Sequence, residues 1–138
     1  MKLSIHVLTS VACLLSPVVF AGTPAPAGTE LYIISPADGA MVDNPVVVRF
    51  GLKGMGVAPA GVERKDTGHH HLLIDTAVPD LTKPIPADEK HRHFGGGQTE
   101  VSLQLSPGMH TLQLLLGDQN HLPHESALLS KRITVTIK

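Results

Sequence analysis

Short runs of apolar residues, several of them alternating with polar ones, predict β-strands along most of the chain. Five such runs are rich in leucine or β-branched residues, at 31–34, 46–50, 101–105, 111–114 and 133–137. The last three alternate with a period of two, which places successive side chains on opposite faces of a sheet. No segment repeats with the period of 3.6 residues that marks an amphipathic helix. The pattern therefore predicts an all-β protein.

Glycine and proline separate these runs and indicate how the strands are connected. A sixth strand is predicted at 70–75, where a run of histidines continues into leucine and isoleucine. The stretches 51–68 and 76–97 are expected to be irregular, with a short seventh strand hidden between Thr76 and Lys90. Six to seven short strands joined by turns predict an immunoglobulin-like antiparallel sandwich of two sheets. A small Greek-key barrel is the alternative.

The same alternation predicts which side chains form the core. We expect the following residues to be buried between the two sheets: Ile33, Val47, Leu72, Ile74, Leu103, Leu112, Leu114 and Val135. The choice depends on the phase of each strand, because an error of one residue moves every side chain to the opposite face.

The first 21 residues have the pattern of a secretory signal peptide. Lys2 precedes an apolar stretch, and Val19 and Ala21 supply the small residues that signal peptidase requires before its cleavage site. We expect cleavage after Ala21, a linker at 22–28 and a β-sandwich domain at 29–138. The protein is then periplasmic or secreted.

Two other roles for this leader are disfavoured. A membrane anchor would need a longer apolar core without Pro17. A lipoprotein would need Cys13 as its anchor, but the residues before Cys13 are a poor lead-in and the apolar run continues past it. No second apolar span follows, so the mature protein is expected to have no membrane span.

Composition excludes several functional classes. The net charge is −1 and the chain has no basic run, so nucleic acid is not an expected partner. Cys13 is the only cysteine, which leaves the mature domain without a disulfide, a thiolate ligand or a cysteine nucleophile. The glycine run 95–97 lacks the Gly-Lys-Ser/Thr ending of a phosphate loop, and no Gly-x-Ser-x-Gly elbow is present. An enzyme is therefore less favoured than a binding protein.

The histidines are the feature that most directly suggests a function. Seven of the nine lie in three clusters near strand ends, at 69–71, at 91 and 93, and at 121 and 124. Loops at one end of a Greek-key sandwich lie close together, so the three clusters are expected to share one rim. Imidazole is a common ligand of copper and zinc. The ligands predicted for a metal site at this rim are His69, His71, His91, His93, His121 and His124.

A single histidine near a strand end is more often a hydrogen-bonded surface residue than a ligand. The prediction of a metal site therefore depends on the clustering of several histidines. Strand alternation places His70 on the inward face with Leu72, and His69 and His71 on the opposite face. His110 lies at the other end of its strand and is expected to hydrogen-bond upstream backbone and support stability. Three carboxylates near the clusters could orient an imidazole: Asp75, Asp118 and Glu125.

Three sequence blocks together resemble a bacterial exported domain family of uncharacterised function. The blocks are Gly-His-His-His-Leu-Leu-Ile-Asp at 68–75, Phe-Gly-Gly-Gly-Gln-Thr-Glu at 94–100, and the stretch from His110 to His124. The resemblance covers nearly all of the expected mature chain. It implies a single periplasmic or secreted domain and supplies no catalytic residues.

These observations predict a periplasmic, histidine-rich protein that binds a transition metal, with copper favoured over zinc. Its role would be that of a carrier, a buffer or an accessory factor, with another periplasmic protein as a further candidate partner. The alternative is a metal-free module that binds a ligand or a protein. A metalloenzyme like superoxide dismutase is less favoured, because the mature chain has no cysteine for a disulfide and no recognisable dismutase motif.

Overall fold

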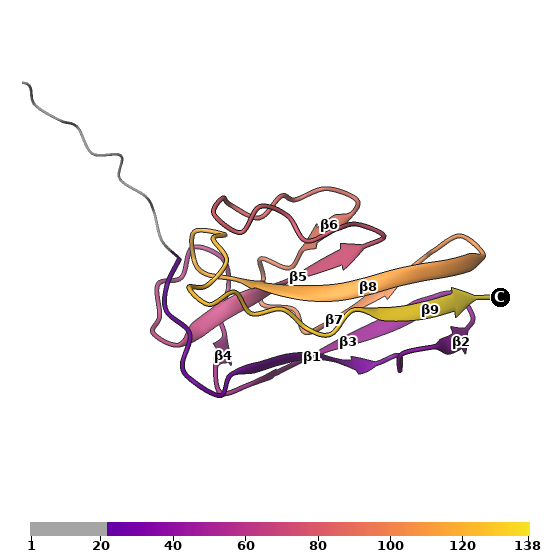
Figure 1. Cartoon of the computed structure of the whole chain (residues 1–138), viewed down its shortest axis with the longest axis horizontal. Helices are drawn as coiled ribbons and strands as arrows, with labels where there is room; N and C mark the ends of the chain where they lie inside the picture. The colour runs from indigo at the N-terminus through magenta and orange to yellow at the C-terminus, as the bar shows by residue number, and fades with distance from the viewer. Residues whose placement is uncertain (1–21) are drawn as a thin grey trace, which may run out of the picture.

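The computed structural model describes residues 22–138, and the signal peptide expected at 1–21 lies outside the described residues. The described part is built from β-strands and irregular segments, which confirms the all-β prediction (Figure 1). Its strands are β1 (Glu30–Ser35), β2 (Ala40–Val42), β3 (Val46–Lys53), β4 (Gly56–Val57), β5 (Thr67–Ile74), β6 (His91–His93), β7 (Glu100–Leu103), β8 (Gly108–Gly117) and β9 (Ile133–Ile137). Between residues 22 and 138 there is no helix long and apolar enough to cross a membrane.

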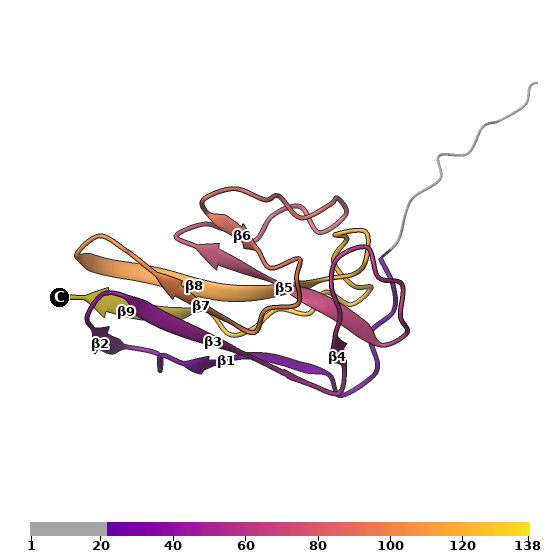
Figure 2. The ribbon, with the colours of Figure 1, turned by 180° about the vertical axis from the view of Figure 1, so that it is seen from behind.

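The strands form two sheets, which Figures 1 and 2 show from opposite sides. One sheet has the order β1-β3-β7 and is antiparallel throughout. The other has the order β2-β9-β8-β5-β4, and β6 also pairs with β5. In this larger sheet β2 runs parallel to β9 and β4 runs parallel to β5, which corrects the expectation of a wholly antiparallel sandwich. The immunoglobulin-like topology stays a prediction.

Three short strands were not expected from the sequence. β2 and β4 are two or three residues long, and β6 begins at His91, just after the region in which a seventh strand was sought. The stretch 76–90 contains no strand. The loop expected over 51–68 is also shorter, because β3 continues to Lys53 and β5 begins at Thr67.

The main core lies between the two sheets. Six of the expected core residues are buried there: Leu72, Ile74, Leu103, Leu112, Leu114 and Val135. Ile33 is partly buried and packs against this core. The prediction for Val47 was wrong, since its side chain is 39% exposed while Val46 and Val48 are buried. Three consecutive valines do not show which alternate positions of the strand face the core. In the fold, the pairing of β3 with β7 turns Val46 and Val48 inward.

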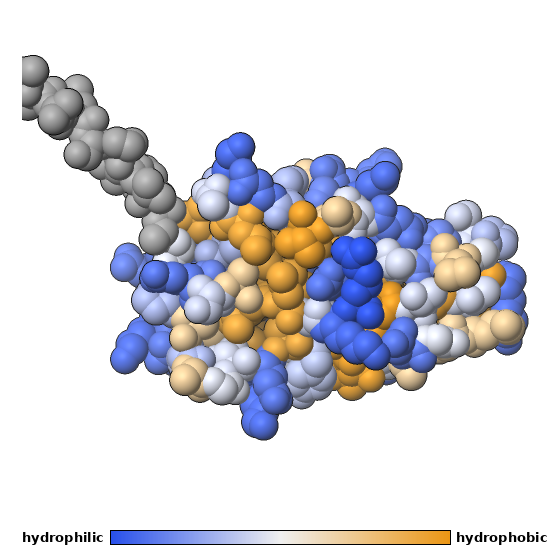
Figure 3. Space-filling model, in the orientation of Figure 1, coloured by the Kyte–Doolittle hydropathy of each residue, from blue (hydrophilic) through white to orange (hydrophobic). Residues whose placement is uncertain are grey.

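A second buried layer covers the outer face of the larger sheet. Every residue of β5 after Thr67 is buried. Both faces of this strand are therefore covered, which explains why its sequence does not alternate between apolar and polar residues. Leu73 and Leu115 lie on its outer side, and the segments 76–90 and 118–130 bury Ile85 and Leu122 there. The segment between β8 and β9 also bridges Leu115 through Leu129. An apolar strip crosses the middle of the face drawn in Figure 3, where this segment runs beside β8.

His110 lies apart from the three histidine clusters, as expected, in an ion pair at the far end of β8. Its Nδ1 is 2.6 Å from Asp75 Oδ2, and its Nε2 is 2.8 Å from the carbonyl oxygen of Ser106. The Asp75 carboxylate raises the pKa of His110, and the Ser106 carbonyl adds to this effect against the opposing effect of partial burial. Partial burial works to raise the pKa of Asp75, but hydrogen bonds from His110 and from the Thr111 N–H lower it overall.

These opposite pKa shifts predict how stability depends on pH. A raised pKa means that His110 contributes fully below about pH 6.5 and that its contribution is lost as the pH rises through its folded value. A lowered pKa means that Asp75 contributes above about pH 4 and loses its contribution below that. The pair is therefore expected to stabilise the fold most between these limits. Urea unfolding should show that His110→Gln costs more at pH 6 than at pH 8.5. An equal cost at both values would contradict the ion pair.

Candidate metal centre

β5 presents two histidines side by side on its outer face. His69 and His71 are separated by one residue, so strand alternation directs both away from the main core. Both side chains are completely buried. His70 points the other way, as predicted, and its ring packs on Phe50 with centres 5.1 Å apart. The run of three histidines is thus divided between two layers of the molecule.

A third histidine comes from β6, the short strand beside β5. His93 is the direct partner of His71 in the antiparallel register. The N–H of the next residue, Phe94, donates to the carbonyl oxygen of His70 and fixes the end of β6 against β5. His93 is exposed, so it forms the solvent side of the cluster.

A fourth histidine is supplied by the turn that follows β8. His121 has a backbone φ of 64°, in the left-handed region that favours glycine and asparagine. The carboxylate of Asp118 shapes this turn, because its Oδ1 accepts the N–H groups of Asn120 and Leu122. Keeping a histidine in the left-handed region costs roughly 1–3 kcal/mol, a strain that proteins retain mainly at functional positions.

The four imidazoles of His69, His71, His93 and His121, here called the histidine tetrad, surround one point. Five of the six distances between their ring centres lie between 4.8 and 5.1 Å, and the sixth, from His71 to His121, is 6.2 Å. Four imidazoles on a tetrahedral ion, with metal–nitrogen bonds of about 2.0–2.1 Å, have ring centres roughly 5 Å apart. Five of the six spacings therefore match a tetrahedral four-histidine site, and His121 lies further from His71 than such a site requires.

The ring nitrogens form a group of three, which His121 joins through His93. One nitrogen each from His69, His71 and His93 lie within 4.8 Å of one another. Nε2 of His121 is 3.2 Å from Nε2 of His93, close to the spacing of roughly 3.3 Å between two ligand nitrogens of a tetrahedral ion. His121 is thus the most distant member from His71 but is adjacent to His93.

His69 and His71 form the buried, inner pair of the tetrad, and burial leaves their ring nitrogens without hydrogen-bond partners. Neither ring nitrogen of His69 or of His71 has a hydrogen-bond partner, although a buried polar group without one costs about 1–3 kcal/mol. Burial, together with the neighbouring histidines, lowers the pKa of His69 to about 4 and that of His71 to about 3. Burial and His121 also lower the pKa of His93. These rings stay neutral at physiological pH, which is the form that binds a metal ion.

Two glycines make room for this packing. A side-chain carbon on Gly117 would lie 2.8 Å from Cε1 of His71, and one on Gly95 would overlap Cε1 of His93. Gly117 is the partner of His69 across β5 and β8. The absence of a side chain at these two positions lets backbone approach the rings closely. Sequence reasoning did not single out Gly117.

The other two histidines predicted as ligands lie elsewhere. The ring of His91 bonds to Asp88, with Nδ1 2.9 Å from Oδ1, although His91 shares its strand with His93. His124 is buried, and its Nδ1 donates to the carbonyl oxygen of Thr23 at 3.0 Å. A side-chain carbon on Gly68 would lie 2.8 Å from Nε2 of His124, so this ring packs on the β5 face opposite the tetrad. Four of the six predicted residues thus come together.

Two of the three carboxylates, Asp75 and Asp118, have roles different from orienting a tetrad imidazole. Asp75 pairs with His110, far from the tetrad. Asp118 is almost completely buried and holds the His121 turn through backbone N–H groups. Its negative charge is close enough to His69 to act against the lowering of that residue's pKa. Asp118 therefore supports the site by shaping the loop and by supplying buried negative charge.

Comparison with known proteins places the chain in a family but names no activity. No curated protein and no solved structure matches it. A family model described as "Domain of unknown function (DUF4399)" matches residues 48–138, which include all three sequence blocks and the whole tetrad. The chain therefore belongs to the DUF4399 family of domains of unknown function.

Proposed function

We propose that the protein binds one transition-metal ion, copper or zinc, in the histidine tetrad. The observation that carries this proposal is the clustering of four imidazoles, with five of six ring-centre distances near 5 Å, in which His69 and His71 are buried without hydrogen-bond partners. A bound ion would accept a lone pair from each ring and would remove part of the cost of burying them.

The donor set limits the choice of metal. All four donors are neutral nitrogens, which suit copper and zinc and are less suited to calcium or magnesium. Met55 packs against the main core, so its thioether is not available to favour Cu(I). Copper(II) binds nitrogen ligands more tightly than zinc does, whereas a tetrahedral site matches the preference of zinc. We favour copper because of its higher affinity for nitrogen ligands, and a competition experiment decides between the two.

Binding or transfer of the metal fits the site better than catalysis does. Catalytic zinc sites keep one position open for water or substrate, whereas four protein ligands complete a tetrahedron. His93 and His121 lie toward solvent, while His69 and His71 are enclosed. A partner could displace the outer pair first, as a carrier or buffer requires. The proposal includes a periplasmic location, for which the expected signal peptide is the support.

Metal titration of tag-free, metal-free protein tests this proposal. Calorimetry should show one ion per chain for copper(II) and for zinc(II), and competition between them gives their relative affinity. Cobalt(II) should bind with the intense visible absorption of a tetrahedral complex. If none of the three ions binds with a stoichiometry of one per chain, the metal-free binding module is favoured instead. In that case His93 and His121 hydrogen-bond to each other without a metal.

A further inference from the structure

The N-terminal residues of the described chain lie against the turn that carries His121. Figures 1 and 2 show the first, indigo part of the chain beside the loop that follows β8. Pro24 forms a bridge with Glu125, and the N–H of Glu125 donates to the carbonyl oxygen of Thr23 at 3.0 Å. Residues 22–24, here called the N-terminal strap, thus add an extended segment to this loop.

The strap reaches the carboxylate that shapes the His121 turn. The backbone N–H of Thr23 donates to Oδ2 of Asp118 at 3.2 Å, across 95 residues of sequence. Oδ1 of the same carboxylate accepts the N–H groups of Asn120 and Leu122, on either side of His121. One buried carboxylate therefore connects the strap on one side with the metal-binding turn on the other.

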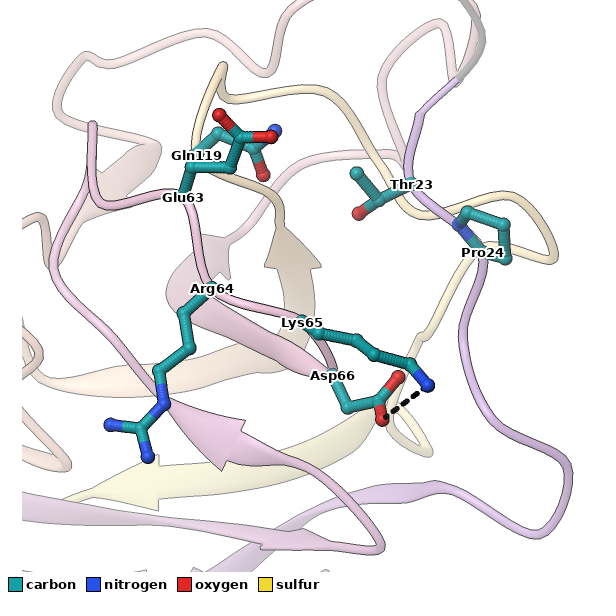
Figure 4. Close-up of a pocket in the computed structure, with 7 residues that line it drawn as sticks. All are labelled: Thr23, Pro24, Glu63, Arg64, Lys65, Asp66 and Gln119. Carbon is teal, nitrogen blue, oxygen red and sulfur yellow. Dashed lines mark ion pairs between the residues drawn. The ribbon is translucent and has the colours of Figure 1, made fainter.

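The fit of the strap is close but is limited to a few contacts. A side-chain carbon on Gly22 would overlap the carbonyl oxygen of Pro123, so only glycine can lie this near the loop. On the other side, Thr23 and Pro24 border an open pocket of about 300 Å³ whose opposite wall is formed by residues 63–66 (Figure 4). Because Thr23 is only partly buried and Pro24 is exposed, the strap is held mainly by its polar contacts with the loop.

We infer that the N-terminal strap is a positioning element of the metal site, which holds His121 in place through Asp118. This inference rests on the proposed metal-binding function and adds a dependence of that site on residues 22–24. The strap fixes Asp118, Asp118 fixes the turn, and the turn holds His121 in its left-handed conformation next to His93. The expected cleavage after Ala21 would leave the three strap residues on the mature chain.

Thr23→Pro tests the strap, because proline has no N–H to donate to Asp118. Loss of a group that orients a metal ligand from outside typically costs about 10- to 100-fold in metal affinity, and we expect a loss of about tenfold. Thr23→Val is the matched control, because it keeps the N–H and a β-branched shape while removing the hydroxyl. Gly22→Val is a second strap variant that acts by steric overlap with Pro123.

A second background separates positioning from general stability. In His121→Asn, asparagine tolerates the left-handed conformation, but the fourth imidazole is gone. Thr23→Pro should then have no further effect on metal affinity, because the ligand that it positions is absent. An equal loss of affinity in both backgrounds, or no loss with Thr23→Pro and Gly22→Val in the natural background, would overturn the inference.

Hydrogen exchange makes the test independent of metal binding. In metal-free protein, Thr23→Pro should speed exchange of the Asn120 and Leu122 amides, whereas Thr23→Val should not. If the unchanged chain binds no metal, the proposed function fails, and faster exchange at these two amides still supports the strap as the element that positions the turn. Unchanged exchange in Thr23→Pro would overturn the strap whatever the metal result.

Discussion

Replacing His69 and His71 together by leucine will abolish high-affinity metal binding and will stabilise the metal-free protein. Four-ligand zinc sites contribute about 10–16 kcal/mol in total, so loss of two ligands should weaken binding by at least about a thousandfold. Both imidazoles are fully buried without hydrogen-bond partners. Apolar side chains of similar size remove that cost, which predicts a gain of about 1–3 kcal/mol in the free energy of unfolding.

These two opposite effects distinguish a ligand from an ordinary buried residue. Affinity is measured by calorimetry with copper(II) and zinc(II), and stability by urea unfolding in the presence of a chelator. His91→Gln is the matched control. His91 lies two residues before His93, but its ring bonds to Asp88, so the metal affinity of this variant should equal that of the unchanged chain. A double variant that binds metal as the unchanged chain does would contradict the site. A metal-free double variant of lower stability would show that the two imidazoles are needed for packing.

Saturating metal should raise the melting temperature of the unchanged protein by about 10–20 °C. A ligand that binds only the folded state at 1,000 times its dissociation constant adds about 4 kcal/mol, and each kcal/mol shifts the melting temperature of a domain of this size by about 4 °C. The effect is expected to be large because all four ligands come from segments that are close together only in the folded chain.

Scanning calorimetry with and without a chelator measures this shift. Removal of the metal should return the melting temperature to that of the metal-free chain. The His69→Leu/His71→Leu double variant should show almost no dependence on metal. A shift of equal size in the double variant would assign the stabilisation to another site and would count against the tetrad.

Local sequence pattern predicted a strand at 70–75, which overlaps β5 (Thr67–Ile74), and assigned its two faces correctly. The alternation rule put His70 toward the core and His69 and His71 on the opposite side, and the structure confirms both placements. It also identified most of the core, because Leu112, Leu114 and Val135 lie in strands with a clear period of two. Val47 was misplaced because a run of three valines has no such period.

Strand periodicity and the placement of imidazoles near strand ends can be read directly from the amino-acid order, whereas the folded arrangement selects which imidazoles meet. His91 and His93 have the spacing of neighbours on one face, yet Asp88 binds the ring of His91. His121 and His124 lie three residues apart, yet they pack on opposite sides of β5. These outcomes depend on β6 pairing with β5 and on the turn shaped by Asp118. Contacts between residues far apart in the chain leave no local periodic signal, so only the folded structure shows them.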